Sequence, residues 1–235
     1  MAASQPVAIV TAASRGMGAA TARELAARGY RLALFATSNA IDALAEELGA
    51  LAVQGSVSEP ADLDRLVRAT LGRYGRIDAV VNNTGHPPTG DLLQITDDAW
   101  HQAMDLVLLN VVRLARLVTP LMEQAGGGAI VNISAFAAVQ PDADFPVSGV
   151  LRAGLASFTK LYADRYAPAR IRMNTILPGF IDSYPESAAR IAQIPAGRYG
   201  TVSEIAHTVA FLLSGDAGYI TGQNILVDGG MVKGI

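Results

Sequence analysis

The sequence predicts an α/β protein with a doubly wound parallel sheet of about seven strands and helices on both faces. Three observations predict it: short apolar runs alternate with helical patterns from end to end, the apolar runs are continuous, and 51% of the 235 residues are hydrophobic. Continuous apolar strands are typical of sheets that are covered on both faces. The predicted strands are Val7–Ala12, Arg31–Ala36, Leu51–Gln54, Ile77–Asn83, Gly128–Ser134, Ile171–Leu177 and Asn224–Gly229.

Helices are predicted between these strands, and their ends carry local signals. The first helix begins in a glycine turn at Gly16 and stops at Gly29. A later helix has Ser58 as its N-cap and Pro60 in its first turn, and it ends before Gly75. No repeat, linker or low-complexity segment interrupts the alternation, so residues 1–235 are predicted to form a single domain.

The composition excludes several classes of function. The chain has no cysteine, which excludes disulfides, thiolate catalysis and cysteine metal sites. Its three histidines are far apart, so no metal site is expected. A net charge of −3 with only two lysines leaves no basic surface for nucleic acid. Neither a signal peptide nor an apolar run long enough to span a membrane is visible, so a soluble cytoplasmic protein is expected.

A glycine-rich loop follows the first predicted strand and leads into a helix. It reads TAASRGMG, from Thr11 to Gly18. Gly16 and Gly18 let the backbone approach a pyrophosphate, and the helix N-terminus supplies N–H donors and the positive end of a dipole. The pattern predicts a dinucleotide-binding domain of the Rossmann type, with an ordinary tight turn as the alternative.

At this loop the chain resembles the classical short-chain dehydrogenase/reductase family, and similar motifs run through nearly its whole length. The loop matches the family's TGxxxGxG pattern, except that Ala12 replaces the first glycine, which is harmless at a negative φ. The later stretches that resemble family motifs are NNTG (82–85), APARIRMNTILPGFIDS (167–183) and GRYGTVSEIAHTVAFLLSGDAGYITGQNILVDGG (197–230). The resemblance implies an oxidoreductase that uses a nicotinamide dinucleotide.

The cofactor that the resemblance implies is NADP(H) in preference to NAD(H). The second strand ends in FATSN, which has no carboxylate to bind the adenosine ribose. Arg15 can pair with a 2′-phosphate, or it is a solvated loop charge. Ser56 stands where the family often has an aspartate that contacts adenine. The residues expected to contact the cofactor are Thr11, Ser14, Arg15, Gly16, Met17, Gly18, Thr37, Ser38, Ser56, Asn82, Gly85, Arg152, Pro178, Gly179, Ile181 and Ser183.

The family's catalytic residues are missing from the positions that should carry them. The family uses the tyrosine of a YxxxK motif as general acid/base, a lysine that lowers the pKa of this tyrosine, a serine that binds the substrate oxygen and an asparagine on the preceding helix. Alignment through RAGL (152–155) places Ser148 at the tyrosine, Arg152 at the lysine, Ala135 at the serine and Val107 at the asparagine. No YxxxK occurs anywhere in the chain.

The substitutes keep only part of this chemistry. A serine hydroxyl is a much poorer acid than a phenol, so Ser148 does not simply take over. Arg152 keeps a positive charge and is able to hold ribose hydroxyls, but it is no proton donor at neutral pH. Ser134, beside Ala135, either binds a substrate oxygen or is bonded to local backbone.

The missing acid has four candidates. Tyr184 lies in the loop after PGFIDS, and it completes a candidate catalytic set with Ser134, Ser148 and Arg152. The other candidates are His86, Asp142 and Asp144. Each of the four is alternatively an ordinary loop residue, and an iminium substrate would need no acid because it is already positive.

Three functions remain open, in order of preference. The first is an NADP(H)-dependent oxidoreductase that acts on a small carbonyl, alcohol or imine with an atypical acid/base site. The second is a catalytically inactive NADP-binding regulatory or partner protein, and the third is a non-redox lyase or isomerase on the same fold. The resemblance also implies a homodimer or homotetramer and a substrate loop around residues 180–200.

Overall fold

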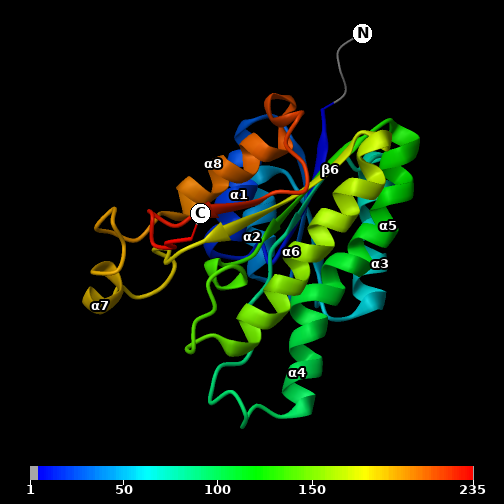
Figure 1. The fold of residues 1–235 in the computed structure, drawn as a ribbon. Coiled ribbons are helices and arrows are strands. Elements are labelled where there is room, and N and C mark those ends of the chain that lie inside the picture. The colour runs from blue at the N-terminus through cyan, green and yellow to red at the C-terminus, as the bar shows by residue number, and fades with distance from the viewer. Residues whose placement is uncertain (1–4, 235) are drawn as a thin grey trace.

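The structure is a computed structural model that describes residues 5–234. Its centre is one seven-stranded sheet in the order β3-β2-β1-β4-β5-β6-β7, and every neighbouring pair is parallel (Figure 1). The predicted doubly wound fold is therefore confirmed. The strands are β1 (Val7–Thr11), β2 (Arg31–Ala36), β3 (Leu51–Gln54), β4 (Ala79–Asn82), β5 (Gly128–Ile133), β6 (Ile171–Pro178) and β7 (Asn224–Val227).

Every predicted strand is present, and the differences lie at strand ends. β2 and β3 have the predicted bounds, whereas β4 is shorter than predicted at both ends and β7 ends two residues early. Apolar residues continue past the hydrogen-bonded ladder: Ile77 precedes β4 and is buried although it pairs with no strand. Hydrophobic patterning thus locates a strand better than it locates its ends.

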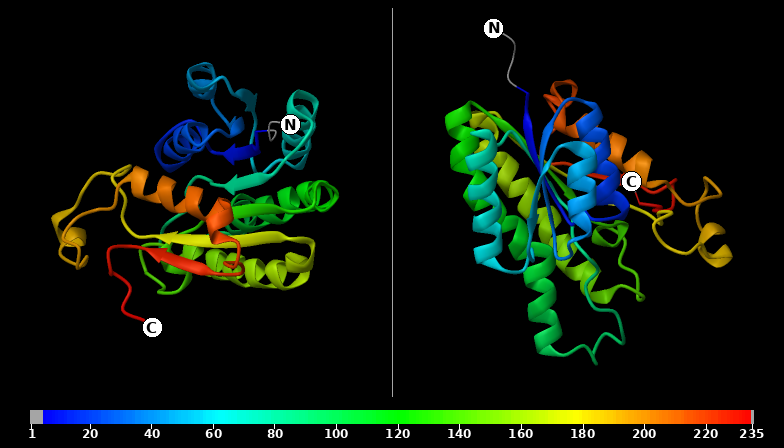
Figure 2. Two further views of the ribbon diagram at one scale, coloured as in Figure 1. Left: turned by 90° about the horizontal axis from the view of Figure 1, so that it is seen from above. Right: turned by 180° about the vertical axis from the view of Figure 1, so that it is seen from behind.

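Helices cover both faces of the sheet, as the right-hand view of Figure 2 shows. One apolar core lies beneath α1, α2 and α8, and a second lies beneath α3, α5 and α6. The helices are α1 (Gly16–Ala27), α2 (Ala40–Leu48), α3 (Pro60–Tyr74), α4 (Asp97–Met104), α5 (Asn110–Ala125), α6 (Pro146–Tyr166), α7 (Ala188–Ile191) and α8 (Val202–Leu213).

The start of α3 corrects one prediction. Its N-cap is Glu59, with no capping hydrogen bond from a side chain, so the prediction that Ser58 caps this helix is wrong. The reason is Pro60, which fills the first helical position and holds the residue before it in extended conformation: Glu59 has φ −97° and ψ 114°. The predicted end is confirmed, because Gly75 follows the helix in the left-handed conformation.

Two segments depart from the regular alternation of strands and helices. A π-helical turn, Asp105–Leu109, joins α4 to α5, so the three form one rod that reaches beyond the sheet (Figure 1). The loop that contains α7 stands out from the body of the molecule in the same figure. Within residues 5–234, none of the helices has the length and apolar character that a membrane crossing needs.

Candidate active site

β1 and β4 are neighbours at the point where the strand order of the sheet reverses. Open α/β sheets bind ligands beside the carboxyl ends of the strands at such a point. Thr11 ties the two strands together there. Its Oγ1 donates a hydrogen bond to the Asn83 carbonyl oxygen at 2.6 Å, and it accepts one from the Asn83 N–H at 2.9 Å. Thr11 is itself buried, so it supports the site rather than lining it.

The glycine loop that follows β1 is folded tightly against this point. A Cβ added to Gly18 would lie 2.3 Å from the Ala12 carbonyl oxygen and 2.9 Å from Asn83 Nδ2, so only glycine fits there. Gly16 has φ +55°. Ala12 has φ +46°, which is not the negative φ at which alanine is unstrained. Arg15 precedes α1 in extended conformation without a side-chain cap, which leaves the N–H groups of that helix end open to a ligand.

A cavity of about 760 Å³ opens over this loop and is called the outer cavity below. The loops after β1, β2, β3 and β4 line it, together with the loop after β6. The predicted cofactor contacts in its lining are Ser14, Arg15, Gly16, Met17, Thr37, Ser56, Gly85 and Ser183.

Other predicted contacts lie elsewhere. Asn82 is buried and donates from Nδ2 to Asn132 Oδ1 at 2.8 Å inside the sheet. Ser38 is exposed and does not belong to the lining. Asn82 is the predicted contact in NNTG, but its neighbour Asn83 lines the cavity. Side chains point to alternate faces along a strand, and this alternation separates the two asparagines.

A second cavity of about 220 Å³ adjoins the outer cavity and is called the inner chamber below. Met17, Asn83, Thr84, His86 and Tyr184 line both. The inner chamber also receives the predicted residues Ser134, Ala135, Ser148, Arg152, Pro178, Gly179 and Ile181. Three phenylalanines that were not among the predicted site residues also line it: Phe136, Phe145 and Phe180.

Arg152 lies in the lining of the inner chamber and is only 4% exposed. It stands one helical turn after Ser148 on α6, and its Nε donates to Ser148 Oγ at 3.0 Å. Its Nη1 donates to the Ile133 carbonyl oxygen at 3.2 Å. Burial lowers the pKa of Arg152 to about 10, which still leaves the guanidinium charged at neutral pH.

Ser134 follows β5 and is 5% exposed. Its Oγ is buried without a hydrogen-bond partner in the described part of the chain, so the alternative of a bond to local backbone is not realised. An unpaired buried hydroxyl is costly unless a ligand satisfies it. Its neighbour Ala135, which the sequence alignment places at the family's serine, offers only a methyl group.

The position that the sequence alignment gives to the family's asparagine contributes no polar group. Val107 lies in the π-helical turn, is 1% exposed, and packs with Ala103, Val147 and Leu151. Asn110, one turn later, is buried and does not line the inner chamber. A proton relay through this helix therefore has no side chain to carry it at position 107.

Two of the four acid candidates line the inner chamber. Tyr184 is 45% exposed and makes an edge-to-face contact with His86, with ring centroids 4.9 Å apart. Desolvation, followed by the positive charges of Arg152 and Arg15, lowers the pKa of His86, although part of this side chain remains open to solvent. Neither Asp142 nor Asp144 is in the lining.

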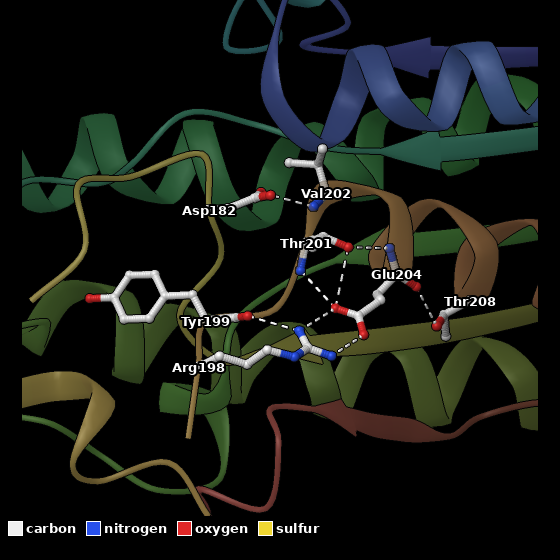
Figure 3. A network of polar contacts seen from close by, with 7 residues as sticks. All are labelled: Asp182, Arg198, Tyr199, Thr201, Val202, Glu204 and Thr208. Carbon is white, nitrogen blue, oxygen red and sulfur yellow. Dashed lines mark hydrogen bonds and ion pairs between the residues drawn. The ribbon is translucent and has the colours of Figure 1, made fainter. Parts of the chain in front are cut away.

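The loop after β6 is held at its far end by a polar network (Figure 3). Arg198 donates to both carboxylate oxygens of Glu204, at 2.9 and 2.6 Å, and Glu204 accepts the Thr201 N–H at 2.8 Å. The Val202 N–H donates to Asp182 Oδ1 at 2.9 Å, which joins the loop to the first residue of α8. These bonds set the position of the residues before and after α7.

The sheet order and the glycine loop define a Rossmann-type α/β protein. Comparison with known proteins then places it more narrowly. A family model described as enoyl-(acyl carrier protein) reductase matches residues 11–232. The chain belongs to the short-chain dehydrogenase/reductase family, a family of oxidoreductases.

Individual relatives agree with this placement. The chain is 35% identical to the 3-oxoacyl-[acyl-carrier-protein] reductase FabG of Escherichia coli and 37% identical to the 3-oxoacyl-[acyl-carrier-protein] reductase of a Synechocystis strain, over 96% of both chains in each case. It is also similar to a solved structure of L-sorbose reductase from Gluconobacter frateurii in complex with NADPH and L-sorbose. That likeness has a TM-score of 0.91 and 31% identity, and it covers 99% of this chain and 98% of the other.

Proposed function

We propose that the protein is an NADP(H)-dependent oxidoreductase that acts on a small carbonyl or alcohol, or on an imine, with an atypical acid/base site. One observation carries the proposal: the outer cavity, built on an open helix N-terminus, adjoins an inner chamber where Ser134, Ser148 and Arg152 meet. A cavity for a dinucleotide beside a cavity for a small molecule is the arrangement that hydride transfer requires.

The residues around the outer cavity fit a dinucleotide. The α1 N-terminus and the glycine loop suit a pyrophosphate, and the Thr84 hydroxyl is buried without a partner in residues 5–234. At the end of β2, Thr37 is exposed and no carboxylate is available for a ribose. Arg15 is exposed in the lining, which favours the 2′-phosphate of NADP(H) over NAD(H).

The bound nicotinamide would supply or accept a hydride. The chain's own residues orient the substrate and donate the proton. Ser134 and Ser148 offer hydroxyl donors to the substrate oxygen, and Arg152 supplies fixed positive charge beside it. Tyr184 carries the only phenol in the lining of the inner chamber within residues 5–234, so we assign it the role of proton donor to that oxygen. We assign the substrate loop to residues 180–200, because Phe180, Tyr184 and Arg190 of this segment line the inner chamber.

The experiment has two stages. Calorimetry with NADPH and NADH comes first, and we expect micromolar NADPH binding with NADH at least about tenfold weaker; Arg15→Ser should remove this difference. Reduction of a carbonyl and imine panel follows. Tyr184→Phe should lower kcat about 100-fold, as loss of a general acid does. The control is Tyr219→Phe, which should leave kcat unchanged because Tyr219 is fully exposed and lines neither cavity.

The results also separate the two alternative functions. Tight NADPH binding without turnover of any carbonyl, imine or alcohol would favour an inactive NADP-binding partner protein. The serine at position 148, where the alignment expects a tyrosine, supports this alternative. A product at the same redox level as its substrate would favour a lyase or isomerase. We further propose a homodimer or homotetramer through α5 and α6. On α6, Val150 and Leu161 are exposed, and light scattering on purified protein tests the oligomeric state.

A further inference from the structure

We propose that the inner chamber selects a substrate that carries a carboxylate, and that Arg152 is the residue which binds it. The inference rests on the proposed reductase function and names its substrate class: a small carboxylic acid whose reacting carbonyl or imine lies close to the acid group. It follows from the charge, the free donors and the walls of the chamber.

The charge in the inner chamber is unbalanced. Its lining contains two guanidinium groups, those of Arg152 and Arg190, and within residues 5–234 it contains no aspartate or glutamate. Arg190 has a distant acidic neighbour, with 3.9 Å between its Nη2 and Asp144 Oδ2. Arg152 has no carboxylate partner in the described part of the chain. A buried charge without a counter-charge is strongly unfavourable, and an anionic ligand removes that cost.

Arg152 also has donors to spare. A guanidinium carries five N–H donors, and hydrogen bonds to Ser148 and Ile133 use one on Nε and one on Nη1. The three remaining donors are one N–H on Nη1 and both N–H groups on Nη2. Parallel N–H bonds from two neighbouring guanidinium nitrogens match the two oxygens of a carboxylate, and such charge-assisted bonds are about twice as strong as neutral ones.

Two hydroxyls lie in the same lining as Arg152 and serve both the carboxylate and the reacting oxygen beside it. Ser134 Oγ is buried, unpaired within the described residues, and lies in the same lining as Arg152. Ser148 Oγ accepts from Arg152, so its own hydrogen remains free to donate to a ligand. Ribose hydroxyls would satisfy some of these donors, but they are neutral and would leave the Arg152 charge uncompensated.

The size and the walls of the chamber limit the rest of the molecule. A volume of about 220 Å³ lies below the usual range for drug-sized ligands, so the substrate is small. Phe136, Phe145 and Phe180 offer apolar faces to its carbon skeleton. Arg190 packs its guanidinium 4.7 Å from the centre of the Phe180 ring and adds a second positive charge at the α7 side.

The test compares an acid with its own neutral ester. Calorimetry measures binding of 4-phenyl-2-oxobutyrate and of its ethyl ester to the unmodified protein at pH 7, and NADPH consumption is followed with both. We expect the acid to bind at least about tenfold more tightly than the ester, because only the acid pairs with Arg152. Arg152→Gln should remove this preference and Arg152→Lys should keep part of it, while Arg68→Gln, an exposed arginine on α3, should leave it unchanged.

Each outcome has a clear reading. An ester that binds to the unmodified protein as tightly as the acid overturns the inference, and this result does not depend on whether the Arg152 variants fold. Preference for the acid that survives Arg152→Gln also overturns it. NADPH binding with reduction of the ester alone keeps the reductase function and rejects the carboxylate. Acid binding without any NADPH binding keeps the anion site and rejects the reductase function.

Discussion

The outer cavity and the inner chamber are built from different kinds of groups. In the outer cavity, the part of the lining that suits a pyrophosphate is backbone, namely a glycine loop and an open helix N-terminus, beside short side chains such as Ser14 and Thr37. In the inner chamber, side chains from β5, α6 and the loop after β6 provide the chemistry, with Arg152 as the central charge. A backbone site is preserved by the fold itself, whereas a side-chain site changes its chemistry with single substitutions.

That contrast explains how one chain keeps the family's glycine loop and lacks its tyrosine and lysine. Helix α6 presents the Ser148 hydroxyl and the Arg152 guanidinium to the chamber. The fold tolerates these residues because both are held by hydrogen bonds within the helix and to β5. Three further predictions test the two regions, from the largest expected effect to the smallest.

Gly18→Ala should damage the outer cavity most. The new Cβ would lie 2.3 Å from backbone oxygen, so the glycine loop or α1 must shift. Overpacking of this kind costs about 1–3 kcal/mol, and we expect a melting temperature lower by roughly 3–9 °C and NADPH binding weakened more than about tenfold. Gly72→Ala is the matched control, because its Cβ would meet nothing within 4 Å in α3 and should slightly raise the melting temperature. Equal effects in the two variants would contradict this account of Gly18.

Glu204→Gln should loosen the loop after β6, which lines the inner chamber. The Arg198 side chain and the Thr201 N–H lower the pKa of Glu204 to about 2, below its usual value near 4.5. A carboxylate with a lowered folded pKa stabilises the fold fully above about pH 4.5 and loses this contribution as the pH falls toward 2.

We therefore expect the Glu204→Gln variant to lose about 1 kcal/mol at pH 7, a value reduced for solvent screening because this side chain is 45% exposed. Its deficit should shrink toward pH 2. Thermal melts of both proteins from pH 2 to 7 check it, with the exposed Glu46→Gln on α2 as control. A deficit that stays constant with pH would show that the ionised carboxylate is not responsible.

Ala12→Gly should have the smallest effect, and in the opposite direction. Ala12 has φ +46°, where an alanine costs about 1 kcal/mol or more. Glycine removes this strain, but the greater entropy of its unfolded chain offsets part of the stabilisation. A rise of about 0.5 kcal/mol in unfolding free energy is expected from denaturant melts. Ala43→Gly, on the exposed side of α2, should instead lose about 1 kcal/mol. A loss at position 12 as large as that at position 43 would rule out strain at Ala12.

The sequence predicted much of the site and missed parts of it for identifiable reasons. Ser148 and Arg152 are predicted from motif spacing, Ser134 as the neighbour of Ala135, and Tyr184 from its place after PGFIDS. All four line the inner chamber. The aromatic wall was not predicted, because an isolated phenylalanine carries no pattern that separates a cavity wall from a core. The cap at Ser58 was predicted wrongly because Pro60 shifts the helix start by one residue.

The sequence by itself determined the order of strands and helices, the glycine loop and the absence of a tyrosine–lysine pair, because these depend on residues that are close together in the chain. Only the tertiary structure decided which polar groups have partners. Whether Arg152 meets a carboxylate, and whether the Ser134 hydroxyl finds a backbone acceptor, depends on segments brought together by folding: β5, α6 and the loops after β4 and β6. Burial and electrostatic balance are properties of that assembly, since solvent is excluded only when these segments pack.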